Sequence, residues 1–438
     1  MLVYGATPGL SILSKHEFMT QSGQLKRFQD KWSLSTSRFQ FGLNMDSFRL
    51  YGTNVYAPCN LPQAPSPISA KYSRYIFEPV RLSGLKHQGY NRLSMSSQKT
   101  QRINQLGEFG LIDLLNKMIV EQRSAVNNAP AHGFRLLVDT GDDTAAWETV
   151  KGTELFTTDT VVEGIHFTRS TTPWADLGWK SLASNISDIA AMGGLPTYAL
   201  ITLGLPPETE VEDIKELYRG MLEISNAYGV SLVGGDMVRS PVVFITVALT
   251  GYHPAKPMLR TTGKAGDKIG VTGPLGGSGG GLRLMLHKEP TELAISQEST
   301  EYLKRCHRRP QPAVDEGRIL ANAGIATAMD VSDGLADDLS KLCRASGLSA
   351  RLYSEQIPLH TLLKEAFPDQ CLELALYGGE DYILLFMAES ELMERVMPQL
   401  EQGSVVGELF SGEPGRVVII DGSGKEIDAG RGGWDHFA

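Results

Sequence analysis

Acidic residues follow short apolar stretches at several points of the sequence, at places where a strand would end and a loop begin. In α/β folds the loops at strand ends usually carry the binding and catalytic groups. Neighbouring carboxylates repel each other, so several of them at one place require a positive partner such as a metal ion. The acids in these positions are Asp142, Asp143, Asp159, Asp236, Asp330, Asp333, Glu380 and Asp381.

Each of these acids also has a purely structural explanation. An aspartate can close a turn by accepting a hydrogen bond from nearby backbone, and Asp330 or Ser332 could cap the helix expected after them. Taken together, the acids offer the oxygen ligands that magnesium prefers, and the cysteines and histidines do not have the spacing of a zinc site. The pattern therefore favours magnesium–phosphate chemistry.

Asp188 differs from the other acids because it lies in a stretch with helical spacing, residues 181–194. Asn185 precedes it by three residues, so both side chains would lie on one face of that helix. A helix could in this way bring Asp188 to a site formed by strand ends.

The glycine-rich run "GVTGPLGGSGGGLRL", residues 270–284, has two readings. It lacks the Lys-Ser/Thr pair of a P-loop and the acidic residue that completes a dinucleotide-binding motif. It is either a tight turn between a strand and a helix, or a set of exposed backbone amides next to an anion.

From Leu106 onwards, segments whose apolar residues have the spacing of a helix alternate with segments that have the spacing of a strand. Helices are expected at 107–122 and at 210–228, the second with Gly229 as its C-cap. Strands are expected at 134–139, 154–159, 197–205, 231–236 and 242–251. We therefore predict an α/β (α+β) protein with an N-terminal domain at 101–259 and a C-terminal domain at 260–438.

Residues 1–100 have a different composition, with twelve lysines and arginines against four acids and no sustained period. We expect a poorly ordered extension or a mis-assigned start, with Met95 as an internal alternative. An organelle transit peptide is a further reading of such a basic, acid-poor segment.

The remaining bulk properties exclude several classes of partner. The net charge of −9 argues against a surface that binds nucleic acid or anionic membranes. The apolar stretches are too short to span a membrane, and the four scattered cysteines are typical of reduced cytoplasmic thiols. We therefore expect a cytoplasmic protein that acts on small molecules.

Eight short motifs occur in order between Leu106 and Ala438. They are "GEFGLI", "GDDTAAW", "TTDTVVEGIHF", "NISDIAAMGGLP", "GGDMVRS", "DVSDGL", "GGEDY" and "GGWDHF". In this order they resemble the thiamine-monophosphate kinase family, which is grouped with aminoimidazole ribonucleotide synthetase and selenophosphate synthetase. The sequence departs from the family pattern at Asp139 and Thr140, before the GDD motif.

The resemblance implies a two-domain synthetase-like fold in which the N-terminal domains of two subunits pair into a β-barrel. It implies transfer of a phosphoryl group from ATP to thiamine monophosphate, giving thiamine diphosphate. The acceptor is itself a phosphate that is mostly ionised at neutral pH, so no general base is expected. Alternatives are another ATP-using enzyme of the group, such as aminoimidazole ribonucleotide synthetase, or a non-catalytic nucleotide-binding relative.

The resemblance also assigns roles to individual residues. Several Mg²⁺ ions would be held by Asp143, Thr157, Thr158, Asp159, Asp188, Asp236, Asp330 and Asp333. ATP would be bound by Gly235, Asp236, Arg260 and Ser332, and the thiamine substrate by His166, Glu380 and Trp434. Without the resemblance, Arg260 could be an exposed loop residue, His166 a core residue and Trp434 an anchor of the chain end.

Overall fold

The structure is a computed structural model of the 438-residue chain. It describes residues 101–126, 134–138, 144–149, 151–286 and 295–430, together with the backbone of four short strands near the N-terminus. Residues Met1–Leu93 form a unit of their own. In it β1 (Ile12–Met19) pairs with β2 (Leu25–Trp32), and β3 (Phe41–Asn44) pairs with β4 (Ser47–Leu50). The expectation for residues 1–100 stays a prediction.

The N-terminal part of the second unit, Ser94–Ala438, contains a four-stranded sheet in the order β7-β10-β8-β9. Its strands are β7 (Thr153–Val162), β8 (Leu195–Leu205), β9 (Ser231–Arg239) and β10 (Phe244–His253). Strand β10 runs antiparallel to β7 and β8, while β8 and β9 are parallel. The strands predicted for this region are confirmed, because the alternation of buried and exposed residues is that of a sheet with one face on the core.

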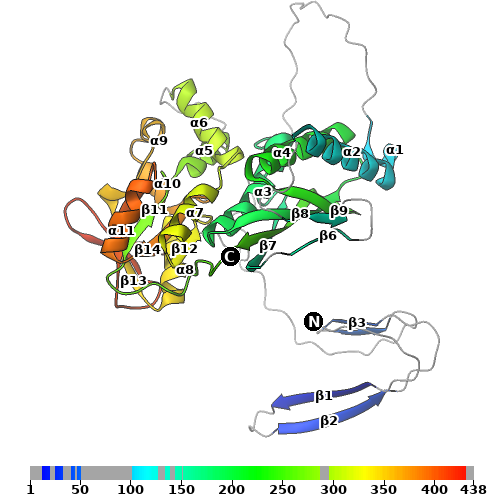
Figure 1. Ribbon diagram of the computed structural model, residues 1–438, viewed down its shortest axis with the longest axis horizontal. Coiled ribbons are helices and arrows are strands. Elements are labelled where there is room, and N and C mark those ends of the chain that lie inside the picture. The colour runs from blue at the N-terminus through cyan, green and yellow to red at the C-terminus, as the bar shows by residue number, and fades with distance from the viewer. Residues whose placement is uncertain are drawn as a thin grey trace, which may run out of the picture. The chain divides into compact units, whose positions relative to one another are not determined.

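Helices α3 (Trp174–Ala191) and α4 (Val211–Tyr228) cover one face of this sheet (Figure 1). They pack closely because a Cβ at Gly178 would lie 1.9 Å from the Leu217 carbonyl oxygen, and one at Gly220 1.8 Å from that of Ala175. Helix α4 ends at Gly229 in the left-handed conformation, φ 70°, as predicted. Before the sheet come α1 (Ile103–Leu106), α2 (Glu108–Val126) and the hairpin of β5 (Leu136–Val138) with β6 (Ala146–Trp147).

The other face of the four-stranded sheet carries exposed apolar side chains. Phe156 is 71% exposed, and Leu200 and Val238 are each 42% exposed. Part of this face is covered by the β5–β6 hairpin, where Trp147 packs on Tyr198 with ring centroids 4.7 Å apart. An uncovered apolar sheet face in a single chain is typical of a protein–protein contact surface.

The C-terminal part is a seven-stranded sheet in the order β12-β14-β11-β15-β13-β16-β17. Its strands are β11 (Lys268–Val271), β12 (Thr327–Asp330), β13 (Ser349–Tyr353), β14 (Leu384–Ala388), β15 (Ser404–Phe410), β16 (Val417–Ile420) and β17 (Glu426–Asp428). Its helices are α5 (Gly277–Leu286), α6 (Gln297–Arg308), α7 (Val314–Ala323), α8 (Leu335–Ser346), α9 (Thr361–Ala366), α10 (Cys371–Tyr377) and α11 (Ser390–Val396), with 3₁₀ turns η1 (Ser354–Gln356) and η2 (Met397–Gln399).

The two α/β parts are packed against each other through a continuous core. Buried residues of α3 and β10 form one cluster with Ala328, Leu384 and Phe386 of the C-terminal sheet. The Arg318 guanidinium of α7 also donates to the Gly193 carbonyl oxygen at 2.7 Å. Groups from both parts can therefore be held in a fixed relation. The predicted boundary at residue 260 stays a prediction.

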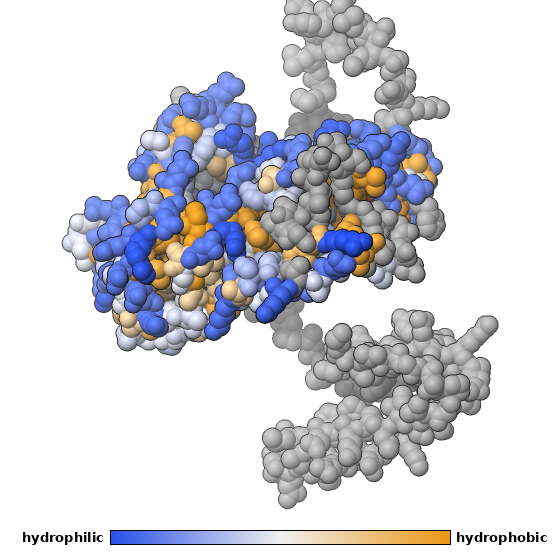
Figure 2. Space-filling model, in the orientation of Figure 1, coloured by the Kyte–Doolittle hydropathy of each residue, from blue (hydrophilic) through white to orange (hydrophobic). Residues whose placement is uncertain are grey.

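Hydrophilic side chains cover most of the visible surface of this unit, with apolar residues in separate patches (Figure 2). Among the described helices, none is both long enough and apolar enough to cross a membrane.

Candidate active site

Strand β7 and helix α3 bring the first predicted acids together. Thr157 and Asp159 alternate onto the face of β7 that α3 covers. The Thr157 hydroxyl donates to Asp188 Oδ2 at 2.5 Å. Burial raises the pKa of Asp159, and burial together with the nearby Asp159 carboxylate raises the pKa of Asp188 to about 6. These two carboxylates are thus held close together at a cost in free energy.

Asp330 joins this pair from the last position of β12. It is 3% exposed, and Ser187 of α3 donates to its Oδ2 at 2.9 Å. Burial and the neighbouring Asp188 carboxylate raise its pKa, while the Arg260 guanidinium opposes that effect. The predicted structural role of Asp330 as a helix cap is wrong, because α8 starts after Gly334 with no side-chain cap.

A cavity of about 350 Å³ lies beside these carboxylates. Thr157, Asp188 and Arg260 form its polar side. Its apolar side includes Met192, Met258 and Met329. One charged wall and one apolar wall suit a ligand that carries both a phosphate and a flat apolar ring.

The acids around the cavity fit a hard divalent cation. Asp159, Asp188 and Asp330 offer only oxygen atoms, and the pKa of each is raised, first by burial and, for Asp188 and Asp330, also by a neighbouring carboxylate. Magnesium and its bound waters accept such a set of ligands. The residues therefore fit the predicted metal.

Thr158, Gly235 and Asp236 lie apart from this group. The Thr158 hydroxyl donates to the Val247 carbonyl oxygen at 2.9 Å, on the uncovered face of the sheet. Asp236 is exposed on the same face. Across the sheet, Asp236 of β9 lies opposite Thr202 of β8, which lies opposite Thr246 of β10, which lies opposite Thr160 of β7. Asp236 is therefore three strand spacings, about 14 Å, from β7. Within one chain, Asp236 and Asp159 therefore do not share a cation.

Asp333 and Ser332 form a different local structure. Asp338 is fully buried and accepts the backbone N–H groups of Ser332 and Asp333, each at 2.9 Å. The Lys341 ammonium pairs with Asp333 and lies 2.9 Å from Asp338 Oδ1. Asp333 thus already has a cation from the chain itself.

Glu380, a predicted substrate residue, is bound by two residues that the sequence analysis missed. Lys180 Nζ donates to Glu380 Oε2 at 2.7 Å and lies 2.9 Å from His307 Nε2. A signal for Lys180 was present, since Lys180, Ser184 and Asp188 follow at intervals of four on one face of α3. His166 is half-buried, and its Nδ1 accepts the Val162 N–H at 3.1 Å.

The glycine-rich run is a turn whose amides hold an internal anion. Asp381 Oδ2 accepts the Gly276 N–H at 2.6 Å, and Asp381 Oδ1 accepts the Ser278 N–H at 3.0 Å. Burial raises the pKa of Asp381 to about 7, against the effect of these two amides. The run is thus a turn between a strand and a helix, and its backbone amides also bind an anion, which is the Asp381 side chain.

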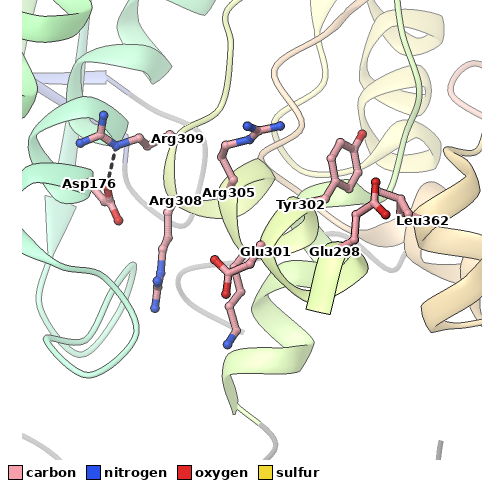
Figure 3. Close-up of a pocket in the computed structure, with 9 residues that line it drawn as sticks. Asp176, Glu298, Glu301, Tyr302, Arg305, Arg308, Arg309 and Leu362 are labelled. Carbon is pink, nitrogen blue, oxygen red and sulfur yellow. Dashed lines mark hydrogen bonds and ion pairs between the residues drawn. The ribbon is translucent and has the colours of Figure 1, made fainter. Parts of the chain in front are cut away.

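A larger cavity, of about 500 Å³, lies along α6, and Figure 3 shows the residues that line it. Two of its arginines are engaged: Arg309 pairs with Asp176 and Glu223, and Arg308 donates to the Thr171 carbonyl oxygen. The lining also carries Glu298 and Glu301 of α6. Its lining mixes acidic and basic side chains, and it contains none of Asp159, Asp188 and Asp330, so the smaller cavity is the better candidate for a magnesium–phosphate ligand.

Asp143 and Trp434 lie outside the described residues, as do Asp139, Thr140 and Asp142. Their predicted roles stay predictions.

Known proteins match this chain over most of its second unit. Family models described as "AIR synthase related protein, N-terminal domain" and "AIR synthase related protein, C-terminal domain" match residues 141–253 and 264–420. A thiamine-monophosphate kinase of Aquifex aeolicus (strain VF5) is 37% identical over 343 residues, which is 77% of this chain and 100% of the relative.

Solved structures agree with this match. A structure described as "AaThiL complexed with AMPPCP and TMP" has a TM-score of 0.58 and 34% identity, and the match covers 78% of this chain and 100% of that one. A thiamine-monophosphate kinase from Stenotrophomonas maltophilia K279a has a TM-score of 0.61 and 30% identity, with 70% of this chain and 96% of that chain covered. The two-domain α/β fold predicted from the sequence is confirmed.

Proposed function

Because the chain belongs to the thiamine-monophosphate kinase family, we propose that it transfers the γ-phosphoryl group of ATP to thiamine monophosphate. The products are thiamine diphosphate and ADP, and the reaction depends on Mg²⁺. The observation that carries the proposal is the group of Asp159, Asp188 and Asp330 with Arg260 beside a cavity of about 350 Å³.

The transfer is direct and in line, since the acceptor phosphate is already a nucleophile at neutral pH. Magnesium bound by the three carboxylates would neutralise the charge between the two phosphate chains. Arg260 adds a fixed positive charge beside them, and the apolar wall with Met192 and Met258 suits the adenine ring. No residue is assigned as a general base.

The site roles form part of the proposal. The proposed metal ligands are Asp143, Thr157, Asp159, Asp188 and Asp330, with Asp236 from the other chain of a dimer; Gly235, Arg260 and Ser332 serve ATP, and His166, Glu380 and Trp434 serve the thiamine substrate. Thr158 and Asp333 are left out of the metal site, because Thr158 lies on the other face of the sheet and Lys341 pairs with Asp333. The location predicted for the protein is the cytoplasm, and neither nucleic acid nor membrane is a proposed partner.

A homodimer belongs to the same proposal. The uncovered sheet face with Phe156, Leu200 and Val238 is the surface through which two N-terminal sheets would pair into a barrel. Asp236 lies on that face and is too distant from Asp159 within one chain. We infer that in the dimer each chain supplies Asp236 to the site of the other.

Mixed dimers test this arrangement. Chains with Asp188→Asn and chains with Asp236→Asn are each expected to be inactive alone. Co-expressed, they form heterodimers in which one of the two sites is intact, so about a quarter of wild-type activity should return. If the mixture stays inactive while the dimers form, Asp236 does not act across the interface.

A panel of acceptors tests the function itself. ADP formation is measured with the full chain, ATP and Mg²⁺, and with thiamine monophosphate, thiamine or formylglycinamidine ribonucleotide. We expect turnover with thiamine monophosphate alone. Turnover only with the amidine nucleotide would identify a synthetase instead, and binding of ATP without turnover would identify a nucleotide-binding relative.

A further inference from the structure

Three polar side chains from three separate elements meet in a buried position next to the site. Lys180 of α3 is 3% exposed, and His307 of α6 is also 3% exposed. Lys180 Nζ contacts Glu380 Oε2 at 2.7 Å and His307 Nε2 at 2.9 Å. Glu380 lies in the loop between α10 and β14, so the group joins the N-terminal part to the C-terminal part.

The protonation states of this group follow from its surroundings. Burial and the adjacent Lys180 ammonium lower the pKa of His307 to about 4, so the imidazole is neutral and its Nε2 can accept from Lys180. Its Nδ1 then carries the proton and faces Ser278 Oγ at 3.0 Å. Burial alone would raise the pKa of Glu380, but Lys180 and His307 outweigh it and lower that pKa. Glu380 is thus a carboxylate with one fixed cation.

The loop that carries Glu380 is held in a strained conformation. Glu380 has φ 66° and Tyr382 has φ 52°, and they are the only non-glycine residues with positive φ in the described part of the chain. Such a backbone costs free energy and persists only where surrounding contacts hold it. Here the Glu380 N–H donates to the Ser332 carbonyl oxygen at 2.8 Å, and Asp381 is fixed by two amides of the glycine-rich turn.

The two oxygens of Glu380 are used differently. Oε2 receives Lys180, whereas Oε1 has no hydrogen bond from any described residue, and the side chain is 28% exposed. Because Lys180 already neutralises the carboxylate, the open oxygen suits an uncharged N–H donor better than a second cation. An amino group on an aromatic ring, as thiamine compounds carry on the pyrimidine, is such a donor.

We propose that Lys180 and His307 are positioning residues, which hold Glu380 so that its Oε1 accepts a hydrogen bond from the amino group of the thiamine substrate. This inference rests on the proposed function and adds two residues and one substrate contact to it. Neither residue contacts the reacting phosphates in this arrangement. Their loss should therefore weaken binding of the thiamine substrate and leave ATP binding unchanged.

Steady-state kinetics of the full chain test the inference. We expect Lys180→Met to raise KM for thiamine monophosphate about tenfold or more and to change KM for ATP less than about twofold, which matches the loss of one charge-assisted contact. Lys180→Arg, which keeps the cation, should recover most of the affinity. Lys268→Met removes another lysine–glutamate pair, to Glu408 at 2.9 Å, and should change neither constant.

A double substitution separates positioning from a general structural role. In the Glu380→Gln background, Lys180→Met should raise KM for thiamine monophosphate by less than a further twofold, because the carboxylate that Lys180 positions is already absent. Equal increases in both KM values, or full additivity with Glu380→Gln, would overturn the inference. If Lys180→Met does not fold, His307→Gln gives the same readout. A wild-type chain that does not use thiamine monophosphate would refute the proposed function instead.

Discussion

Asp188→Asn should make the metal-free protein more stable while it removes activity. Asp188 is half-buried near Asp159 and Asp330, and its pKa is raised to about 6 from an ordinary value of 3.8. The carboxyl therefore holds its proton more tightly when folded than when unfolded. Asparagine keeps the size of the side chain and an oxygen that can accept from Thr157, but it carries no charge.

The size of the effect follows from this pKa. A difference of about two pKa units corresponds to ~3 kcal/mol at a pH well above both values. Partial exposure and remaining repulsion reduce the gain to ~1–2 kcal/mol, or about 1–3 °C in the melting temperature of a unit as large as Ser94–Ala438. Because the folded pKa is the raised one, stability is full below the unfolded pKa and is lost as pH rises through about 6. The gain from Asn should thus be largest at pH 8 and absent at pH 4.

Thermal melts in EDTA at pH 8 and near pH 4 measure this gain, with the exposed Asp369→Asn as a matched control. Addition of Mg²⁺ at pH 8 should reverse the order, since the ion stabilises the wild-type chain and binds the variant weakly. A metal-free Asp188→Asn protein that melts at or below the wild-type temperature at pH 8 would refute the idea that these carboxylates repel each other without a cation.

Three further outcomes are expected. Arg260→Met should raise KM for ATP about tenfold or more, with KM for thiamine monophosphate nearly unchanged, because only the charge beside the ATP phosphates is lost. Phe156→Asp, at a 71% exposed position of the uncovered sheet face, should give monomers in light scattering with little change in melting temperature. Asp381→Asn should lower the free energy of urea unfolding by ~1–3 kcal/mol at pH 5, because one amide of the glycine-rich turn would face an NH₂ group, and by less at pH 8, because burial raises the pKa of the wild-type carboxyl to about 7 and its charge then costs stability.

Many helices and strands could be predicted because the spacing of their apolar residues is visible within short stretches of sequence. The strand at 197–205 and the helix that ends at Gly229 follow from alternation and from a C-cap, both of which are read within a few residues. Alternation also separates Thr158 from Thr157 and Asp159, a distinction that the motif alone does not make.

Contacts between distant segments could not be read in this way. The Ser187–Asp330 hydrogen bond joins residues 143 positions apart. The contact of Lys180 with His307 depends on how α6 packs against α3. The positive φ angles of Glu380 and Tyr382 could not be predicted from the sequence either, since neither residue type favours them. These features depend on tertiary packing, and they lie at the proposed site.

The acids of the site differ in whether a lysine of the same chain forms an ion pair with them. Glu380 has Lys180, and Asp333 has Lys341, so these carboxylates are ionised and oriented without any ligand. Asp159, Asp188 and Asp330 have no ion pair among the described residues, and burial raises the pKa of all three. A fold that holds three half-buried or buried carboxylates with no ion pair, and with only the nearby Arg260 guanidinium to offset part of their charge, loses stability unless an external cation binds there. We therefore propose that the metal site lies at these three acids and that Glu380 takes part in recognition of the organic part of the substrate.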